Sequence, residues 1–296
     1  MSVINEFEVV PIPFITYPVA NFDGYKLYGS PVLRRQFLNA LANTPKTKPI
    51  IGTINYLVNN KIIIPCIVKK GIFDYIKYKT INPNQRFAES IPVLGFYDSR
   101  NKKVYVVTNN NHVFFESDSK ALLAKYTIHE LMHKVAEEDS NFLSNYKDEL
   151  QQFYSDMFTE MFKLKNKVDV MPIVTLIYNM EMANYYTMDK FKTYYNLLDS
   201  TFKNHTGLKR KEYEKMLNDY ILSAKVLLSG AGGFKKAANN FAHVLNPIYK
   251  AYKTAFGINL RYLVIQEIII VSEVICIYSE TKTSNKIYNS IKNLVK

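Results

Sequence analysis

The sequence predicts an α+β protein, with a small antiparallel or mixed sheet in the first half and a mostly helical second half. Two observations predict this class. Three short apolar or β-branched runs, 91–97, 103–108 and 112–116, are separated by Ser-Arg-Asn and Asn-Asn-Asn, and runs joined by tight Asn-rich turns are typical of an antiparallel meander. After about residue 145, apolar residues recur at helical spacing almost to the end of the chain.

The size and composition of the chain indicate a folded globular protein. Its 296 residues are enough for one large domain or two modest ones, with a sizeable buried core in either case. Hydrophobic residues make up 48% and charged residues 22%, which is ordinary globular usage and excludes disorder for most of the chain. Cys66 and Cys276 lie in separate apolar runs, so we expect buried free thiols and no disulfide framework.

The chain is basic, with 38 Lys and Arg against 26 Asp and Glu and a formal charge of +12 at pH 7. Such an excess favours an acidic partner, for instance nucleic acid, anionic lipid or an acidic protein surface. Lys, Asn, Ile and Tyr are all abundant, however, as expected of coding by an AT-rich genome, and this hints at a viral source. The charge alone therefore leaves a nucleic-acid partner open.

No targeting or membrane segment is expected. The first 14 residues lack the basic stretch and long apolar stretch of a secretory signal. The most apolar region, 258–278, contains Arg261, Glu267 and Glu273, so a buried helix explains it better than a membrane span. We therefore expect a cytoplasmic or virion-associated protein.

Two elements are expected before the meander. Ser30 and Pro31 are typical of a helix N-cap and first helical position, and the apolar residues of 32–43 follow at helical spacing. The β-branched run 61–68 lies between Asn-Asn and Lys-Lys pairs and is predicted to be a strand. We treat residues 1–90 as an N-terminal α/β segment.

The longest predicted helix follows the meander. One residue of 117–119 (Ser-Asp-Ser) can cap it, and no Pro or Gly interrupts the chain from there to about Glu138. Further helical runs are predicted at 145–165, 172–200, 209–229, 234–256 and 258–280. We divide this part of the chain into a core, 91–165, and a helical C-terminal subdomain, 166–296.

The sequence His-Glu-Leu-Met-His lies at 129–133, within the longest predicted helix. His129 and His133 are one helical turn apart, so both imidazoles project from one face, with a spacing that suits two nitrogens at about 2 Å from one zinc ion (Zn2+). Glu130 is then near the metal without facing it. From there its carboxylate can take a proton from a metal-activated water and pass it to a leaving amine. The chain has only 5 histidines, which makes a chance match rare.

With strands before it and an acidic helix after it, this motif resembles that of the zincin metallopeptidases. The resemblance covers 91–165, about a quarter of the chain. It implies a mixed sheet whose edge strand holds extended peptide, with 103–108 or 112–116 as that edge, and an active-site helix bearing the motif. It also implies a third metal ligand further along. Lys134 departs from the pattern, because such helices usually carry an uncharged residue directly after the second His.

The third ligand differs among zincins. In metzincins the motif continues to a Gly and then a final ligand, but Ala136 replaces the Gly that permits the necessary turn, which disfavours Asp139. In gluzincins the ligand is a Glu on the next helix. If the two helices form a hairpin that turns near Asn141, Glu149 lies opposite His133.

We therefore predict Glu149 as the third ligand and keep Glu160 and Asp139 as alternatives. The thermolysin-like ExxSD pattern fits 152–156 except that Gln152 replaces the Glu, so either the ligand has moved by one turn or a longer loop brings Glu160 in. Asp156 or Gln152 would suit a supporting role, accepting the outer N–H of a ligand histidine. The residue that stabilises the oxyanion is left open.

Together these residues predict zinc-dependent hydrolysis of a peptide bond in a protein or peptide substrate. His129, His133 and Glu149 would hold the zinc, and Glu130 would be the general base. The alternative is a structural or assembly protein, for instance in a virion, with a structural or vestigial zinc site, because the helical region after 165 shows no chemistry of its own. A nucleic-acid-associated protein is a third interpretation, which a contiguous basic surface beside the metal would favour.

Overall fold

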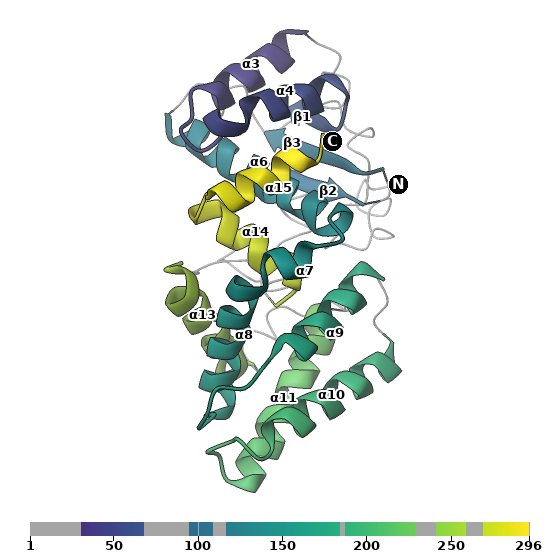
Figure 1. Cartoon of the computed structure of the whole chain (residues 1–296), viewed down its shortest axis with the longest axis vertical. Helices are drawn as coiled ribbons and strands as arrows, with labels where there is room; N and C mark the ends of the chain where they lie inside the picture. Colours follow the sequence, from purple (N-terminus) through teal and green to yellow (C-terminus); the bar gives the residue numbers. More distant parts are fainter. Residues whose placement is uncertain are drawn as a thin grey trace, which may run out of the picture. The chain divides into compact units, whose positions relative to one another are not determined.

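The computed structural model describes residues 31–67, 95–99, 101–108, 117–183, 187–228, 241–258 and 269–295. The chain divides into two compact units (Figure 1). The first comprises Met1–Ser140 together with Ser279–Lys296, and the second comprises Asn141–Tyr278. The described residues are mostly helical and include a small mixed sheet, which confirms the predicted α+β class at this level. The division of the chain at residues 90 and 165 stays a prediction.

The first unit combines the sheet with helices from both ends of the chain. Its described elements are α3 (Pro31–Ala42), η2 (Lys48–Ile50), α4 (Ile51–Asn59), β1 (Ile63–Ile67), β2 (Gly95–Asp98), β3 (Lys103–Thr108), α6 (Ser117–Glu138) and α15 (Asn285–Asn293). The predicted helix at 32–43 and the predicted strand at 61–68 are both present, as α3 and β1. Helix α4 was not predicted.

The described sheet has three strands in the order β1-β3-β2. Strand β1 pairs with β3 in parallel, from Ile63 opposite Val104 to Ile67 opposite Thr108. Strand β2 pairs with β3 in antiparallel fashion. Strand β3 is thus flanked on both sides, so the expectation that 103–108 is an edge strand is wrong. The other candidate edge, 112–116, lies outside the described residues.

A tight turn joins β2 to β3, as the Ser-Arg-Asn sequence predicts. The Asp98 carboxylate accepts hydrogen bonds from the backbone N of Asn101 at 3.3 Å and from its side-chain Nδ2 at 2.6 Å. Lys102 follows in the left-handed region, with φ 56°. These two features reverse the chain and set the antiparallel register that opposes Asp98 to Lys103.

Helix α6 is the element around which the first unit packs. It contacts β2 and β3, and it also contacts α3 and α15 (Figure 1). Ile128, Leu131 and Met132 are fully buried on it. The absence of Pro and Gly lets the helix run without interruption from Ser117 to Glu138, as predicted.

Lys134 ties α6 to the turn between β2 and β3. This residue is only 4% exposed, and its Nζ donates to the backbone oxygen of Lys102 at 3.3 Å and to the Glu138 carboxylate. Nζ also lies 5.9 Å from the ring centroid of Tyr97 on β2. Lys134, the charged residue that departs from the zincin pattern, therefore packs against partners within the first unit.

The end of the chain returns to the first unit through two short helices. Helix α14 (Val271–Thr281) begins in the second unit, and its last turn belongs to the first. Ser284 then caps α15, accepting a hydrogen bond from the backbone N of Ile287 at 3.4 Å. Helix α15 contacts α6 and η2, so residues remote in sequence complete this unit.

The second unit is helical in its described residues. Its remaining elements are α7 (Phe142–Asn145), α8 (Lys147–Phe162), α9 (Met171–Met182), α10 (Met188–Phe202), α11 (Arg210–Leu228) and α13 (Ala242–Phe256). The single predicted run 172–200 is wrong, because α9 ends at Met182 and α10 starts afresh behind Thr187, whose hydroxyl caps it. Among the described residues, no helix combines the length and apolar character needed to cross a membrane.

Aromatic side chains fill the core of the second unit. Phe153 on α8 stacks on Phe256 of α13, with ring centroids 5.7 Å apart. Five residues further along α8, the ring centroid of Phe158 lies 5.0 Å from that of Phe202 on α10. Helix α8, the acidic helix predicted after the motif, therefore packs an aromatic face against its neighbours. Its carboxylates face away from this core.

Candidate metal centre

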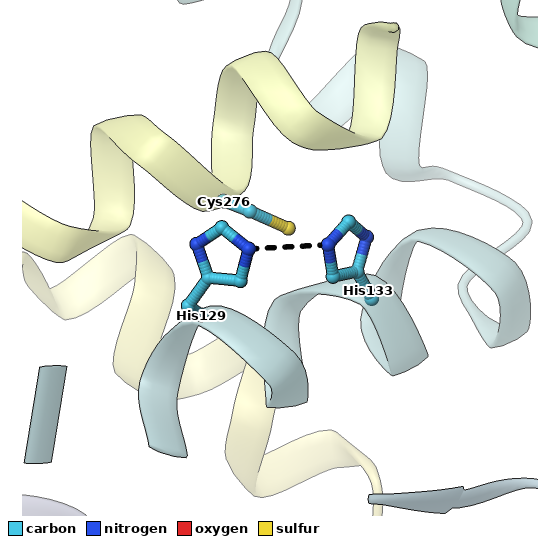
Figure 2. Close-up of side chains that lie close together, drawn as sticks. All are labelled: His129, His133 and Cys276. Atoms are coloured by element: carbon cyan, nitrogen blue, oxygen red, sulfur yellow. Dashed lines mark hydrogen bonds between the residues drawn. The ribbon is translucent and has the colours of Figure 1, made fainter. Parts of the chain in front are cut away.

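The two histidines of the motif face one another on helix α6. Nε2 of His129 lies 3.2 Å from Nε2 of His133, and the ring centroids are 5.0 Å apart with the planes inclined at 71° (Figure 2). Both side chains are half-buried. The one-turn spacing therefore brings the two outer ring nitrogens together, as the sequence predicts.

The separation of these two nitrogens matches a shared metal ion. Two imidazole nitrogens bound tetrahedrally to one zinc ion, with bonds of 2.0–2.1 Å, are about 3.3 Å apart. The same separation also suits an N–H···N hydrogen bond, provided that one of the rings carries its proton on Nε2. Whether the pair binds a metal ion or forms a hydrogen bond thus depends on which ring nitrogens carry protons.

Glu280, at the end of α14, lies against the other nitrogen of His129. Its Oε1 is 2.8 Å from Nδ1 of His129, within hydrogen-bond distance, and its Oε2 is 2.6 Å from Nζ of Lys125 on α6. Lys46 Nζ also donates to the backbone oxygen of Glu280. One lysine and one histidine of the first unit therefore contact this carboxylate, and a second lysine contacts the backbone of the same residue.

The surroundings of Glu280 keep it ionised at neutral pH. Burial raises the pKa of its carboxyl group, but the interactions with His129 and Lys125 outweigh this effect and leave the pKa below its ordinary value. Burial and the like charge of Lys125 lower the pKa of Lys46, while Glu280 opposes that shift. The carboxylate is thus an anion that cations hold in place.

Cys276 lies on α14 one turn before Glu280, on the same side of that continuous helix. Its thiol is buried and belongs to no disulfide. One ligand atom each from His129, His133 and Cys276 fall within 4.8 Å of one another, and this is the one group of potential metal ligands among the described residues (Figure 2). A thiolate and two imidazoles are a donor set that suits zinc and copper.

Glu130 projects from α6 toward the sheet. Its side chain is 6% exposed and lies against the backbone of Gly95 on β2. Burial, together with the negative charges of Glu280 and Glu130, raises the pKa of the nearby Tyr126 hydroxyl to about 12. The predicted general base is therefore a buried group near the start of β2.

The predicted third ligand, Glu149, is half-buried on α8 in the second unit. Among the described residues it is not a member of the His129, His133 and Cys276 group, and its role as a ligand stays a prediction. The alternative Glu160 accepts from Lys250 at 2.8 Å and from Lys163 at 3.2 Å.

Gln152 and Asp156, which were expected to support a ligand histidine, pair with each other, and His243 also has a partner within the second unit. Gln152 Nε2 donates to the Asp156 carboxylate at 2.9 Å, across one turn of α8. His243 is exposed on α13, and its Nε2 lies 2.7 Å from Asp219 Oδ2 on α11. These two pairs lie within the second unit.

Sequence reasoning found the histidine pair and Glu130 but missed Glu280 and Cys276. The motif is local, whereas α14 reaches α6 only through folding of the whole chain. Cys276 and Glu280 are four residues apart and lie among apolar residues near the C-terminus. This spacing predicts one polar stripe on a buried helix, and it is the signal from which both residues could have been found. Comparison of the chain with protein-family models, curated proteins and solved structures gives no match.

Proposed function

We propose that this chain is a metal-dependent peptidase in which His129 and His133 bind the metal and Glu130 is the general base. The observation that carries the proposal is the 3.2 Å separation of the two Nε2 atoms within an HExxH helix. The buried position of Glu130, next in sequence to His129, supports it. So does the small mixed sheet against which this helix packs, since zincins combine the same two elements.

In this proposal, Glu130 moves the protons. A bound metal ion would polarise the scissile carbonyl and lower the pKa of a water molecule. Glu130 would accept a proton from that water as the water oxygen bonds to the carbonyl carbon. It would then deliver the proton to the amide nitrogen as the C–N bond breaks, which yields one carboxylic acid and one amine.

Two residues compete for the place of third ligand. The zincin resemblance favours Glu149, whereas the geometry favours Cys276, the residue that groups with the histidines. A thiolate donates more charge to the metal than a carboxylate does and selects softer metals. We therefore propose Cys276 as the third ligand and zinc as the metal, which leaves a fourth coordination position for the substrate and water.

A substitution at Glu130 tests the peptidase proposal. We expect Glu130→Gln to bind as much zinc as the wild type while its hydrolysis of fluorescein-labelled casein and an internally quenched peptide library falls at least about 100-fold. Glu137→Gln is the matched control, because this carboxylate is on the same helix but pairs with Lys102. A zinc-loaded wild type that cleaves neither probe, or a fully active Glu130→Gln variant, would contradict the proposal.

A structural metal centre is the second candidate, and the burial of Cys276 favours it. Cysteine and histidine together are the usual ligands of structural zinc, in which all four positions are taken by protein. The two candidates differ in access to the metal. A cobalt-substituted peptidase site changes its visible spectrum when a hydroxamate inhibitor binds, whereas a closed structural site does not respond.

A further inference from the structure

We infer that Glu280 positions His129 by holding the proton of this ring on Nδ1, so that Nε2 keeps its lone pair for a metal. The inference rests on the proposed metal site and adds to it a residue from the far end of the chain. Glu280 touches neither substrate nor metal in this proposal. It acts through His129, and is therefore a positioning residue.

The carboxylate of Glu280 lies directly against the ring of His129. Oε1 of Glu280 is 2.8 Å from Nδ1 of His129, and an ionised carboxylate only accepts hydrogen bonds. A neutral imidazole carries one N–H. The 2.8 Å contact with an anionic oxygen favours that proton on Nδ1, which leaves Nε2 bare. Metal-binding histidines usually have such an outer partner, which fixes the tautomer and the orientation of the ring.

Two lysines hold Glu280 in place. Lys125 Nζ lies 2.6 Å from the other oxygen, Oε2, and Lys46 Nζ donates to the backbone oxygen of the same residue. Lys125 stands one turn before His129 on α6, so helix α6 supplies both the group that anchors Glu280 and the ring that Glu280 orients. A rigid carboxylate orients the ring more strictly than a mobile one would.

The other tautomer of His129 would obstruct the metal site. If His129 carried its proton on Nε2, that N–H would point to Nε2 of His133 at 3.2 Å and occupy the space where a metal binds. Nδ1 would then be a lone pair facing the negative oxygen of Glu280 at 2.8 Å, which is repulsive. Glu280 therefore disfavours the tautomer that blocks metal binding.

The tautomer can be measured directly in the metal-free full-length chain. Long-range 1H–15N spectra of the 15N-histidine-labelled protein, recorded at about pH 8.5, well above the ordinary histidine pKa of about 6.5, identify the protonated nitrogen of each ring. The resonance of His129 is assigned by its loss in His129→Gln. We expect a protonated Nδ1 and a bare Nε2. A proton on Nε2 of His129 in the wild type would overturn the inference without any variant.

Metal affinity gives the second readout. We expect Glu280→Gln to bind zinc about 10- to 100-fold more weakly than the wild type, with a larger share of His129 in the Nε2-protonated form. Glu137→Gln, the same chemical change on α6, should alter neither property, because its carboxylate pairs with Lys102.

The two measurements separate this inference from the proposed function. A wild type that binds no zinc overturns the proposed function, whatever the tautomer. A wild type that binds zinc, with a Glu280→Gln variant of equal affinity and unchanged tautomer, overturns the role of Glu280 alone. If Glu280→Gln does not fold, the wild-type tautomer still decides the matter.

Discussion

Gly95 on β2 and Glu130 on α6 approach one another so closely that a side chain at residue 95 would displace the predicted general base. A Cβ built on Gly95 would lie 2.8 Å from Glu130 Cγ and 3.2 Å from the backbone oxygen of Tyr105 on β3. Strand and helix thus hold the carboxylate between them. The position of Glu130 depends on the absence of a side chain on the adjacent strand.

Gly95→Ala is expected to lower both stability and activity. The new methyl group must push the Glu130 side chain or the β2 backbone aside, and overpacking of this kind costs about 1–3 kcal/mol. Hydrolysis should fall while zinc binding is retained, since neither histidine moves. Urea unfolding and the casein assay measure the two effects. Gly52→Ala on α4 is the control, because a Cβ there meets nothing within 4 Å and Ala favours a helix. A Gly95→Ala variant as stable and active as wild type would contradict this packing.

Lys134→Met is expected to destabilise the chain without affecting the metal. The substitution keeps the apolar stem but leaves the Lys102 carbonyl and the Glu138 carboxylate without their buried donor, at a cost of about 1–3 kcal/mol. Lys215→Met removes a similar i,i+4 pair with Asp219, but Lys215 is 71% exposed, so its effect should be no more than about 0.5 kcal/mol. Equal losses in urea unfolding would show that Lys134 is an ordinary surface lysine.

Cys276→Ser tests the choice of third ligand. A cobalt-substituted wild type with a thiolate ligand has a sulfur-to-cobalt charge-transfer band in the near ultraviolet, and Cys276→Ser should lack it. Cys66→Ser, at the only other cysteine of the chain, should retain the band. If the wild type has no such band, Cys276 is not a ligand, and loss of metal in Glu149→Gln would then support the ligand predicted from the sequence.

The pair between Glu160 on α8 and Lys250 on α13 should stabilise the second unit only above acid pH. The hydrogen bond from Lys250 is the largest cause that lowers the pKa of Glu160 below its ordinary value. A depressed acid pKa contributes stability above the unfolded-state pKa, and this contribution is lost as the pH falls through the folded-state value. Lys250→Met should thus cost no more than about 1 kcal/mol at pH 7, and the difference should vanish at acid pH in urea unfolding. A constant difference would indicate lost packing.

The elements that the sequence predicted best are those whose signals are local. The uninterrupted stretch before Glu138 predicts α6, Pro31 predicts the start of α3, and the Asn-rich turn after Asp98 predicts the β2–β3 hairpin. Each of these depends on neighbours within a few residues. The same holds for the histidine pair, because one helical turn determines where both rings lie.

What the sequence did not reveal depends on contacts between distant segments. Strand β3 is flanked on both sides because β1 pairs with it in parallel, and hydrophobic alternation in β3 is the same at an edge and in the middle of a sheet. Glu280 reaches His129 because α14 and α15 return to the first unit. No periodicity in either segment encodes that return.

Zinc binding by the single histidine variants tests most directly whether His129 and His133 share one ion. The measurement is the metal content, by mass spectrometry, and the zinc affinity, by competition with a chromogenic chelator, of the wild type, His129→Gln and His133→Gln. His243→Gln is the matched control, since His243 is exposed and pairs with Asp219. We expect one zinc per wild-type and His243→Gln chain and its loss in each of the other two variants. A wild type without stoichiometric metal, or equal zinc affinity in all four proteins, would contradict the shared site.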